Sequence, residues 1–205
     1  MRVDKVILRA ALSTLAAILV LMSFMVFTLS FLYPSTMMEI TYDLGMDASS
    51  VRCAKRAYSQ SGNDVYFIAY ATEVAIGADD YAKIEECGEL LIADEQFEEY
   101  CAERNAALST ESYDQYVLGQ VCLAKYRLEK STDAVAKAYE WLYGTFPPNN
   151  ALAALGITAL TEGDTLTASA VKEKMDEMNT ASLSGTDLEY YGKIMSVLEN
   201  ALING

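Results

Sequence analysis

The sequence contains no histidine at all. This absence excludes Ser-His-Asp and Cys-His catalysis, excludes His-ligated zinc, and removes the commonest general base. The chain also lacks a phosphate-binding P-loop, a dinucleotide-binding glycine fingerprint and the G-x-S-x-G turn of the α/β-hydrolases. We therefore expect no catalytic residue, no cofactor and no enzymatic activity.

Cysteine is scarce, with four residues at Cys53, Cys87, Cys101 and Cys122. None of them forms a C-x-x-C pair, and no EF-hand loop is present, so we expect no metal site. Each cysteine has apolar neighbours on a predicted helix, which favours a small buried core residue. An oxidising compartment would also permit a disulfide, for which Cys87 and Cys101 on neighbouring antiparallel helices are the best pair.

Only three prolines are present and the glycines are scattered, so no flexible linker is visible. Basic residues are also few: residues 34–205 carry 12 Lys and Arg against 28 Asp and Glu, a charge near −16. A field of this sign repels nucleic-acid phosphates, so we expect no nucleic acid as a partner. The many helical carboxylates, such as Glu85, Glu89 and Glu99, are typical of a solvated face.

One long apolar run is present near the N-terminus. Residues 10–33 contain no charge and, as a helix, span about 36 Å, more than the hydrocarbon layer of a bilayer. Tyr33 suits the membrane interface and Pro34 ends the helix. A cleaved signal peptide is the alternative, but the run is too long for one and lacks an A-x-A cleavage site. We predict an uncleaved transmembrane helix over 10–33.

The charges on either side of this run predict its orientation. Arg2, Lys5 and Arg9 precede the run, whereas the first charges after it are acidic. By the positive-inside rule, residues 1–9 are a cytoplasmic N-terminus and residues 34–205 an extracytoplasmic domain. We expect a single-pass protein of the cell membrane.

The rest of the chain shows helix periodicity interrupted by short polar breaks, and no strand-like alternation. At three of these breaks a glycine is followed, within two residues, by an aspartate that could cap the next helix. These aspartates are Asp47, Asp79 and Asp164. The predicted helices cover 36–44, 48–61, 64–77, 79–93, 95–107, 111–129, 132–144, 149–161, 165–179 and 186–203. The fold class is all-α, with one transmembrane helix followed by stacked helical hairpins; an irregular helical bundle is the alternative.

A Leu-Gly or Ile-Gly pair recurs at intervals of about 32 to 42 residues. Residues 115–147 supply Leu118-Gly119, small Ala134 and Ala138, and a final Pro147. Residues 152–168 supply Leu152, Leu155-Gly156, Ala159 and Ala168. These residues resemble tetratricopeptide (TPR) repeats, although Gln115 and Cys122 replace the consensus Trp and Tyr. In this resemblance, Gly119 and Gly156 allow close approach between the two helices of a hairpin.

Fourteen tyrosines are present, and several sit one turn apart on predicted helices. Core packing with a solvated hydroxyl is one interpretation. The other is an aromatic-lined groove that binds a partner, because tyrosine is favoured at interfaces. The residues we predict to bind a partner are Tyr66, Tyr70, Tyr113 and Tyr116.

The resemblance and the layout together imply a membrane-anchored interaction scaffold or adaptor with an extracytoplasmic TPR-like domain. Proteins of this layout often serve secretion or envelope assembly. The expected partner is a protein segment with basic and apolar residues. Two alternatives stay open: a carboxylate-based extracytoplasmic hydrolase, which needs two acids facing one pocket, and an accessory subunit of a larger membrane complex.

Overall fold

The computed structural model describes residues 2–107, 112–142, 150–183 and 185–204, and these residues form helices and no strands. The first helices are α1 (Arg2–Leu32), α2 (Pro34–Asp43), α3 (Asp47–Gln60), α4 (Val65–Gly77), α5 (Tyr81–Ile92) and α6 (Phe97–Ala107). They are followed by α7 (Tyr113–Arg127), α8 (Ser131–Leu142), α9 (Asn150–Thr161), α10 (Thr165–Asp176), the 3-10 turn η1 (Thr180–Ser182) and α11 (Gly185–Asn204). The predicted all-α class is confirmed, and the predicted helix ends differ from these by a few residues.

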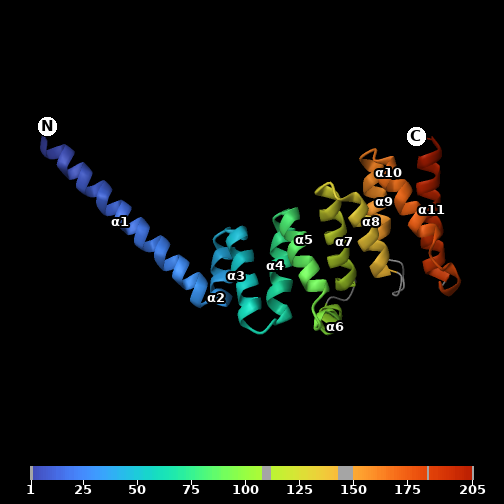
Figure 1. Cartoon of the computed structure of the whole chain (residues 1–205), viewed down its shortest axis with the longest axis horizontal. Coiled ribbons are helices and arrows are strands. Elements are labelled where there is room, and N and C mark those ends of the chain that lie inside the picture. Colours follow the sequence, from blue (N-terminus) through green and yellow to red (C-terminus); the bar gives the residue numbers. More distant parts are fainter. Residues whose placement is uncertain (1, 108–111, 143–149, 184, 205) are drawn as a thin grey trace.

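Helix α1 projects from the rest of the molecule (Figure 1). Its segment Val6–Leu32 is apolar, 27 residues long and without buried residues. At the rise of an α-helix it is about 40 Å long, against about 30 Å of hydrocarbon in a bilayer. Among the described residues, one helix, at the N-terminus, is therefore long and apolar enough to cross a membrane. The helix begins at Arg2, ahead of the span predicted from residue 10.

Helices α2 to α11 form a stack of up-and-down helices (Figure 1). In its first half, α2, α3, α4, α5 and α7 pack mainly in that order, each against the next. In its second half, α7 packs against both α8 and α9, and α10 packs against α8, α9 and α11. Here alternate helices touch as well as sequential ones, so the second half has two layers. Helix α6 packs against α4 and α7, to the side of the series formed by α2, α3, α4, α5 and α7.

The stack contains two hydrophobic clusters that meet at α7. Val117 and Val121 on one side of α7 belong to the first cluster, which extends back to α2. Leu118 and Cys122 on its other side belong to the second cluster, which extends to α11. All four side chains are fully buried. An amphipathic helix normally buries one stripe, whereas α7 buries two, because it lies in the middle of the stack.

The turns follow the predicted chemistry in part. Gly45 and Gly163 adopt the left-handed conformation that favours glycine, and Asp164 caps α10 by accepting from the Thr167 amide. The prediction is wrong by one residue at α5, where Asp80 accepts from the Lys83 amide. At α3 it is also wrong, because Asp47 is the first helical residue and the preceding residue makes no side-chain cap.

The close helix contacts predicted at Gly119 and Gly156 are confirmed at only one of the two glycines. A Cβ at Gly156 would lie 2.9 Å from Val171 Cγ1 and 3.2 Å from Leu198 Cδ2, so the predicted close approach is confirmed there. It is wrong at Gly119, where a Cβ would meet nothing within 4 Å. The tight site in this part of the stack is Gly88 of α5, whose Cβ would overlap Val121 of α7. No repeat pattern marked Gly88, because it has no Leu before it.

An ion-pair network joins α5 to α7. Lys125 Nζ lies 2.9 Å from Glu85 Oε1 and 2.6 Å from Glu89 Oε1, and Lys130 Nζ lies 2.7 Å from Glu85 Oε2. The Lys125 and Glu85 side chains are only 9% and 14% exposed. Hydrogen bonds from Lys130 and Lys125 hold the pKa of Glu85 below its usual value. The prediction of a solvated acidic face is therefore wrong for Glu85.

All four cysteines are buried, as predicted, and all four are free. Burial raises the pKa of Cys87 to about 11 and the pKa of Cys122 to about 12, which keeps both thiols protonated. The Cys87–Cys101 bridge is not formed. This disulfide was predicted on the assumption that the helices carrying Cys87 and Cys101 are antiparallel neighbours, whereas α6 packs mainly against α4 and α7.

Candidate partner-binding surface

Aromatic side chains from four helices form two groups of contacting rings in the first half of the stack, here together called the aromatic row. Helix spacing produces it locally, because residues three or four positions apart share a helix face. Tyr66 and Tyr70 are such a pair on α4, and Tyr113 and Tyr116 are another on α7. The full row consists of Tyr42 of α2, Tyr66, Phe67 and Tyr70 of α4, Tyr100 of α6, and Tyr113 and Tyr116 of α7.

Ring contacts define the row at both of its ends. At the α2 end, the Tyr42 and Tyr70 rings meet edge to face with centroids 6.1 Å apart, and Tyr66 lies 6.4 Å from Tyr70. At the α7 end, the Tyr100 and Tyr113 centroids are 5.7 Å apart and the Tyr113 and Tyr116 centroids 6.4 Å apart. These separations lie in the range of favourable aromatic pairs. The rings therefore support one another in fixed positions.

The four predicted residues differ in what they offer to a partner. Tyr66 and Tyr116 are 46% and 39% exposed. Tyr70 is half-buried and contacts the rings of Tyr42 and Tyr66. Tyr113 is only 5% exposed, so it presents almost no surface to a partner. It lies against the ring of Tyr100 and the guanidinium of Arg104, which α6 places there. The predicted residues thus reach one region of the surface, with Tyr113 supporting the row from inside.

A carboxylate holds the α7 end of the row in place and ties it to Arg104 of α6. Glu73 Oε1 on α4 accepts a hydrogen bond of 2.9 Å from the Tyr113 hydroxyl and one of 2.6 Å from Arg104 Nη2. The guanidinium carbon of Arg104 also lies 5.4 Å from the centre of the Tyr113 ring, a cation–π distance. Asn105 Oδ1 accepts from the Tyr113 amide at 2.7 Å. Burial and the Glu73 charge raise the pKa of Tyr113, so its phenol stays neutral.

Sequence reasoning missed Tyr42, Phe67 and Tyr100. Tyr42 and Tyr100 each lack a second tyrosine one turn away on their own helix, so they depend on packing between helices to join the row. Phe67 lies three residues before Tyr70 and contacts Tyr66 within α4, but a pattern of tyrosine pairs does not include a phenylalanine. Tyr100 belongs to α6, the helix that interrupts the predicted tandem of hairpins. Its position became visible only when α6 was placed beside α4 and α7.

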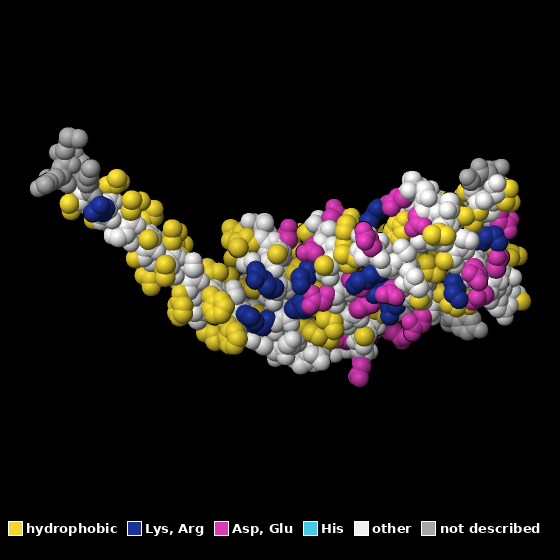
Figure 2. Space-filling model, turned by 45° about the horizontal axis from the view of Figure 1, so that its top comes forward, with side chains coloured by type: hydrophobic (Ala, Val, Ile, Leu, Met, Phe, Trp, Pro, Cys, Tyr) yellow, Lys and Arg dark blue, Asp and Glu magenta, His cyan; other side chains and the backbone are white. Residues whose placement is uncertain are grey.

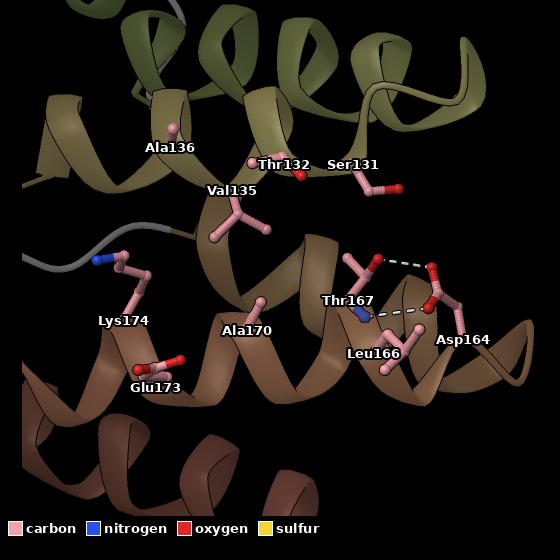
Figure 3. Close-up of a pocket in the computed structure, with 10 residues that line it drawn as sticks. All are labelled: Ser131, Thr132, Val135, Ala136, Asp164, Leu166, Thr167, Ala170, Glu173 and Lys174. Atoms are coloured by element: carbon pink, nitrogen blue, oxygen red, sulfur yellow. Dashed lines mark hydrogen bonds between the residues drawn. The ribbon is translucent and has the colours of Figure 1, made fainter.

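A hollow lies between α8 and α10, away from the aromatic row, and has a volume of about 510 Å³ (Figure 3). Val135 and Ala136 of α8 and Ala170 of α10 give it an apolar lining, and Glu173 and Lys174 lie at one end (Figure 3). Ser131, Thr132, Asp164, Leu166 and Thr167 complete its lining. Several of these polar groups already have partners: Lys174 pairs with Glu177, for example, and stacks on Tyr139.

The carboxylates of this hollow do not form a glycosidase-like pair. Asp164 and Glu173 are nine positions apart in the α10 segment, a helical rise of about 13 Å, and lie at opposite ends of the hollow (Figure 3). An acid and a base that flank a sugar bond lie within roughly 10 Å of each other. Asp164 also accepts from the Thr167 hydroxyl at 2.6 Å and from its amide at 3.0 Å. These bonds lower the pKa of Asp164, whereas a general acid needs a raised pKa. The hollow is better suited to holding an apolar side chain than to acid–base chemistry.

Comparison with known proteins does not assign this chain to a family. The chain has no significant match among protein-family models, curated proteins or solved structures. Its function must be inferred from its own side chains and their surroundings.

Proposed function

We propose that this protein is a membrane-anchored interaction scaffold. In this proposal α1 spans the cell membrane, and the stack of helices lies outside the cell and binds a protein partner through the aromatic row. Such a tethered adaptor would serve secretion or envelope assembly. Binding is its role, and no chemistry of its own is required.

A TPR-like architecture for the stack is supported by its second half. The leucines and alanines that resemble the repeat consensus are buried in the second cluster: Leu118, Ala134, Ala138, Leu152, Leu155, Ala159 and Ala168. Helix α7 pairs with α8 and also contacts α9, while α10 contacts both α9 and α8. This is the arrangement expected when helical hairpins stack with their neighbours. Pro147, the last consensus residue, lies outside the described residues.

The membrane part of the proposal is supported by α1. Its apolar side chains are exposed along its length, which would be unfavourable in water and is favourable in lipid. Arg2, Lys5 and Arg9 lie at its N-terminal end, before its uncharged run, and acidic residues follow the helix. The positive-inside rule then places the N-terminus in the cytoplasm and the stack outside.

The observation that carries the proposal is the aromatic row itself. Three of its tyrosines are exposed while their neighbours hold them in position, so little side-chain entropy is lost on binding. Tyrosines of this kind are enriched among the residues that dominate binding energies. They come from α2, α4 and α7, so a partner would contact several helices at once.

The charge of the stack indicates the chemistry of the partner. At least nine of its twelve basic residues are engaged in ion pairs with Asp or Glu. Figure 2 shows Lys and Arg side chains next to Asp and Glu side chains along one side of the stack. The surplus carboxylates therefore determine the field that a partner meets. We expect a partner segment with basic residues for this field and apolar residues for the rings.

Site-specific photocrosslinking tests the binding surface. Benzoylphenylalanine in place of Tyr66 or Tyr116, in the full-length chain in its source cells, should crosslink one and the same protein. The matched control is Tyr81 on α5, which is similarly exposed but outside the row. The crosslink at position 66 should weaken when Tyr42→Ala removes the ring that contacts Tyr70. It should also weaken when added salt shortens the screening length below its physiological value of about 8 Å. Equal crosslinking from Tyr81, or none from the row, would refute the proposal.

Thiol labelling of intact cells tests the orientation. The four natural cysteines are buried, so the unchanged chain should react little with a membrane-impermeant maleimide. A Leu188→Cys variant adds an exposed thiol at the start of α11. We expect this variant to be labelled from outside the cell. Labelling that requires lysis would place the stack in the cytoplasm instead.

A further inference from the structure

The joint between α1 and the stack is built from several contacts. Arg56 of α3 donates from Nη1 to the Ser30 carbonyl at 3.0 Å, and its guanidinium carbon lies 5.1 Å from the centre of the Phe31 ring. Gln60 Nε2 donates to the Phe31 carbonyl at 3.2 Å. These groups satisfy carbonyls in the last turn of α1, which the helix itself cannot satisfy, and a cation is favourable there. Leu29 also packs against the first cluster. The direction of α1 therefore determines how the stack is held.

The chain reverses at this joint. Tyr33 is the single non-helical residue between α1 and α2, and Pro34 begins α2. Figure 1 shows that α2 runs from the joint toward the same side as the N-terminal end of α1. The turn between α2 and α3 thus lies on the side from which α1 arrives. A bilayer crossed by α1 would have its surface near this turn.

The end of the stack formed by this turn is apolar and exposed. Leu44 is 69% exposed, and Ile40 and Met46 are exposed as well; these three residues are called the α2–α3 tip. Gly45 lies between two of them in the left-handed conformation and makes the turn possible. Figure 2 shows hydrophobic side chains at the end of the stack next to α1. Three such side chains together would gain free energy by leaving water.

We propose that the α2–α3 tip is a second membrane contact, which enters the interface of the bilayer that α1 spans. Apolar side chains on such an element reach roughly 5–10 Å into the headgroup and acyl boundary. The exposed Asp43 beside Leu44 favours a zwitterionic lipid surface over an anionic one. The joint and the tip together would fix the stack relative to the membrane at two points. The inference rests on the proposed anchor and adds to it.

Spin-label accessibility in the full-length chain tests this contact. Nitroxide labels at Leu44→Cys, Leu188→Cys and Leu19→Cys would report the tip, the last helix and the middle of α1. All three positions are exposed, and the natural cysteines are buried. In phosphatidylcholine nanodiscs, the labels at 19 and 44 should collide more with oxygen and less with a water-soluble nickel chelate than the label at 188 does.

The outcomes separate the two proposals. If the label at 19 is in lipid and the label at 44 is as accessible to nickel as that at 188, the tip contact is refuted and the anchor stands. If the label at 19 is also accessible to nickel, the anchor fails, and the tip contact fails with it. As a second check, a label at Ile40→Cys should lose its oxygen exposure when Leu44→Glu and Met46→Glu add charge to the tip. An unchanged signal there would also count against the contact.

Discussion

Gly88 should be the position on α5 that tolerates a methyl group least. A Cβ there would overlap Val121 Cγ2, whereas a Cβ at Gly119, on the facing helix α7, would meet nothing within 4 Å. Both glycines lie in helix interiors, where replacing Gly with Ala favours the helix by about 1 kcal/mol. This gain is common to Gly88→Ala and Gly119→Ala, so it cancels when the two variants are compared. What remains is the overpacking of the α5–α7 contact, at about 1–3 kcal/mol.

Thermal unfolding followed by circular dichroism, in detergent and on the full-length chain, measures this difference. We expect Gly119→Ala to unfold slightly above the unchanged chain and Gly88→Ala to unfold below Gly119→Ala. For a protein of this size, 1 kcal/mol corresponds to roughly 2–4 °C in Tm, so the two variants should differ by several degrees.

A double variant shows whether the contact itself is responsible. Val121→Ala removes the methyl group that the new Cβ would meet. In the Val121→Ala background, Gly88→Ala should therefore cost less than it does alone, and the coupling should be measurable in a double-mutant cycle. Equal stability of Gly88→Ala and Gly119→Ala, or a coupling of zero, would show that α5 and α7 do not approach as described.

Two further perturbations test the network and the stack. Glu85→Gln should destabilise the protein at pH 7 by about 1–3 kcal/mol, because it weakens bonds to Lys125 and Lys130. Since the folded pKa of Glu85 is lowered, its stabilisation is present above the ordinary value of 4.5 and is lost as pH falls through the lowered value, so urea unfolding should show the two proteins converging in acid. Gly156→Leu should overpack Val171 and Leu198 and, in hydrogen exchange, reduce protection in α9 to α11 more than in α2 to α4; a uniform loss would contradict a stack coupled through neighbours.

The helices could be read from the sequence because their signals are local. Periodicity, glycines and capping aspartates lie within a few residues of the ends they mark, so all ten predicted helices of the stack were found. The errors were also local and small, as when Asp80 capped α5 in place of Asp79. The apolar run of α1 needed no tertiary information at all.

The sides of the helices could not be read in the same way. Gly88 and Gly119 differ only in what the opposite helix places before them, and this depends on the packing of α5 on α7. Glu85 looked like any exposed carboxylate until Lys125 and Lys130 approached it from another helix. Tyr113 was expected on the surface because α6 could not be positioned over it from sequence. Contacts between distant segments decide all three cases.

The position of α7 links the aromatic row to the rest of the stack. Tyr113 and Tyr116 belong to the row, yet the same helix contributes Leu118 and Cys122 to the second cluster. A partner bound at the row therefore contacts a helix whose other side is held by α8 and α9. At its other end, the row begins at Tyr42 on α2, which follows α1 by a single non-helical residue. The row thus lies between α1 and the two-layered half of the stack. In the proposed function, packed helices would therefore connect a bound partner to the anchor.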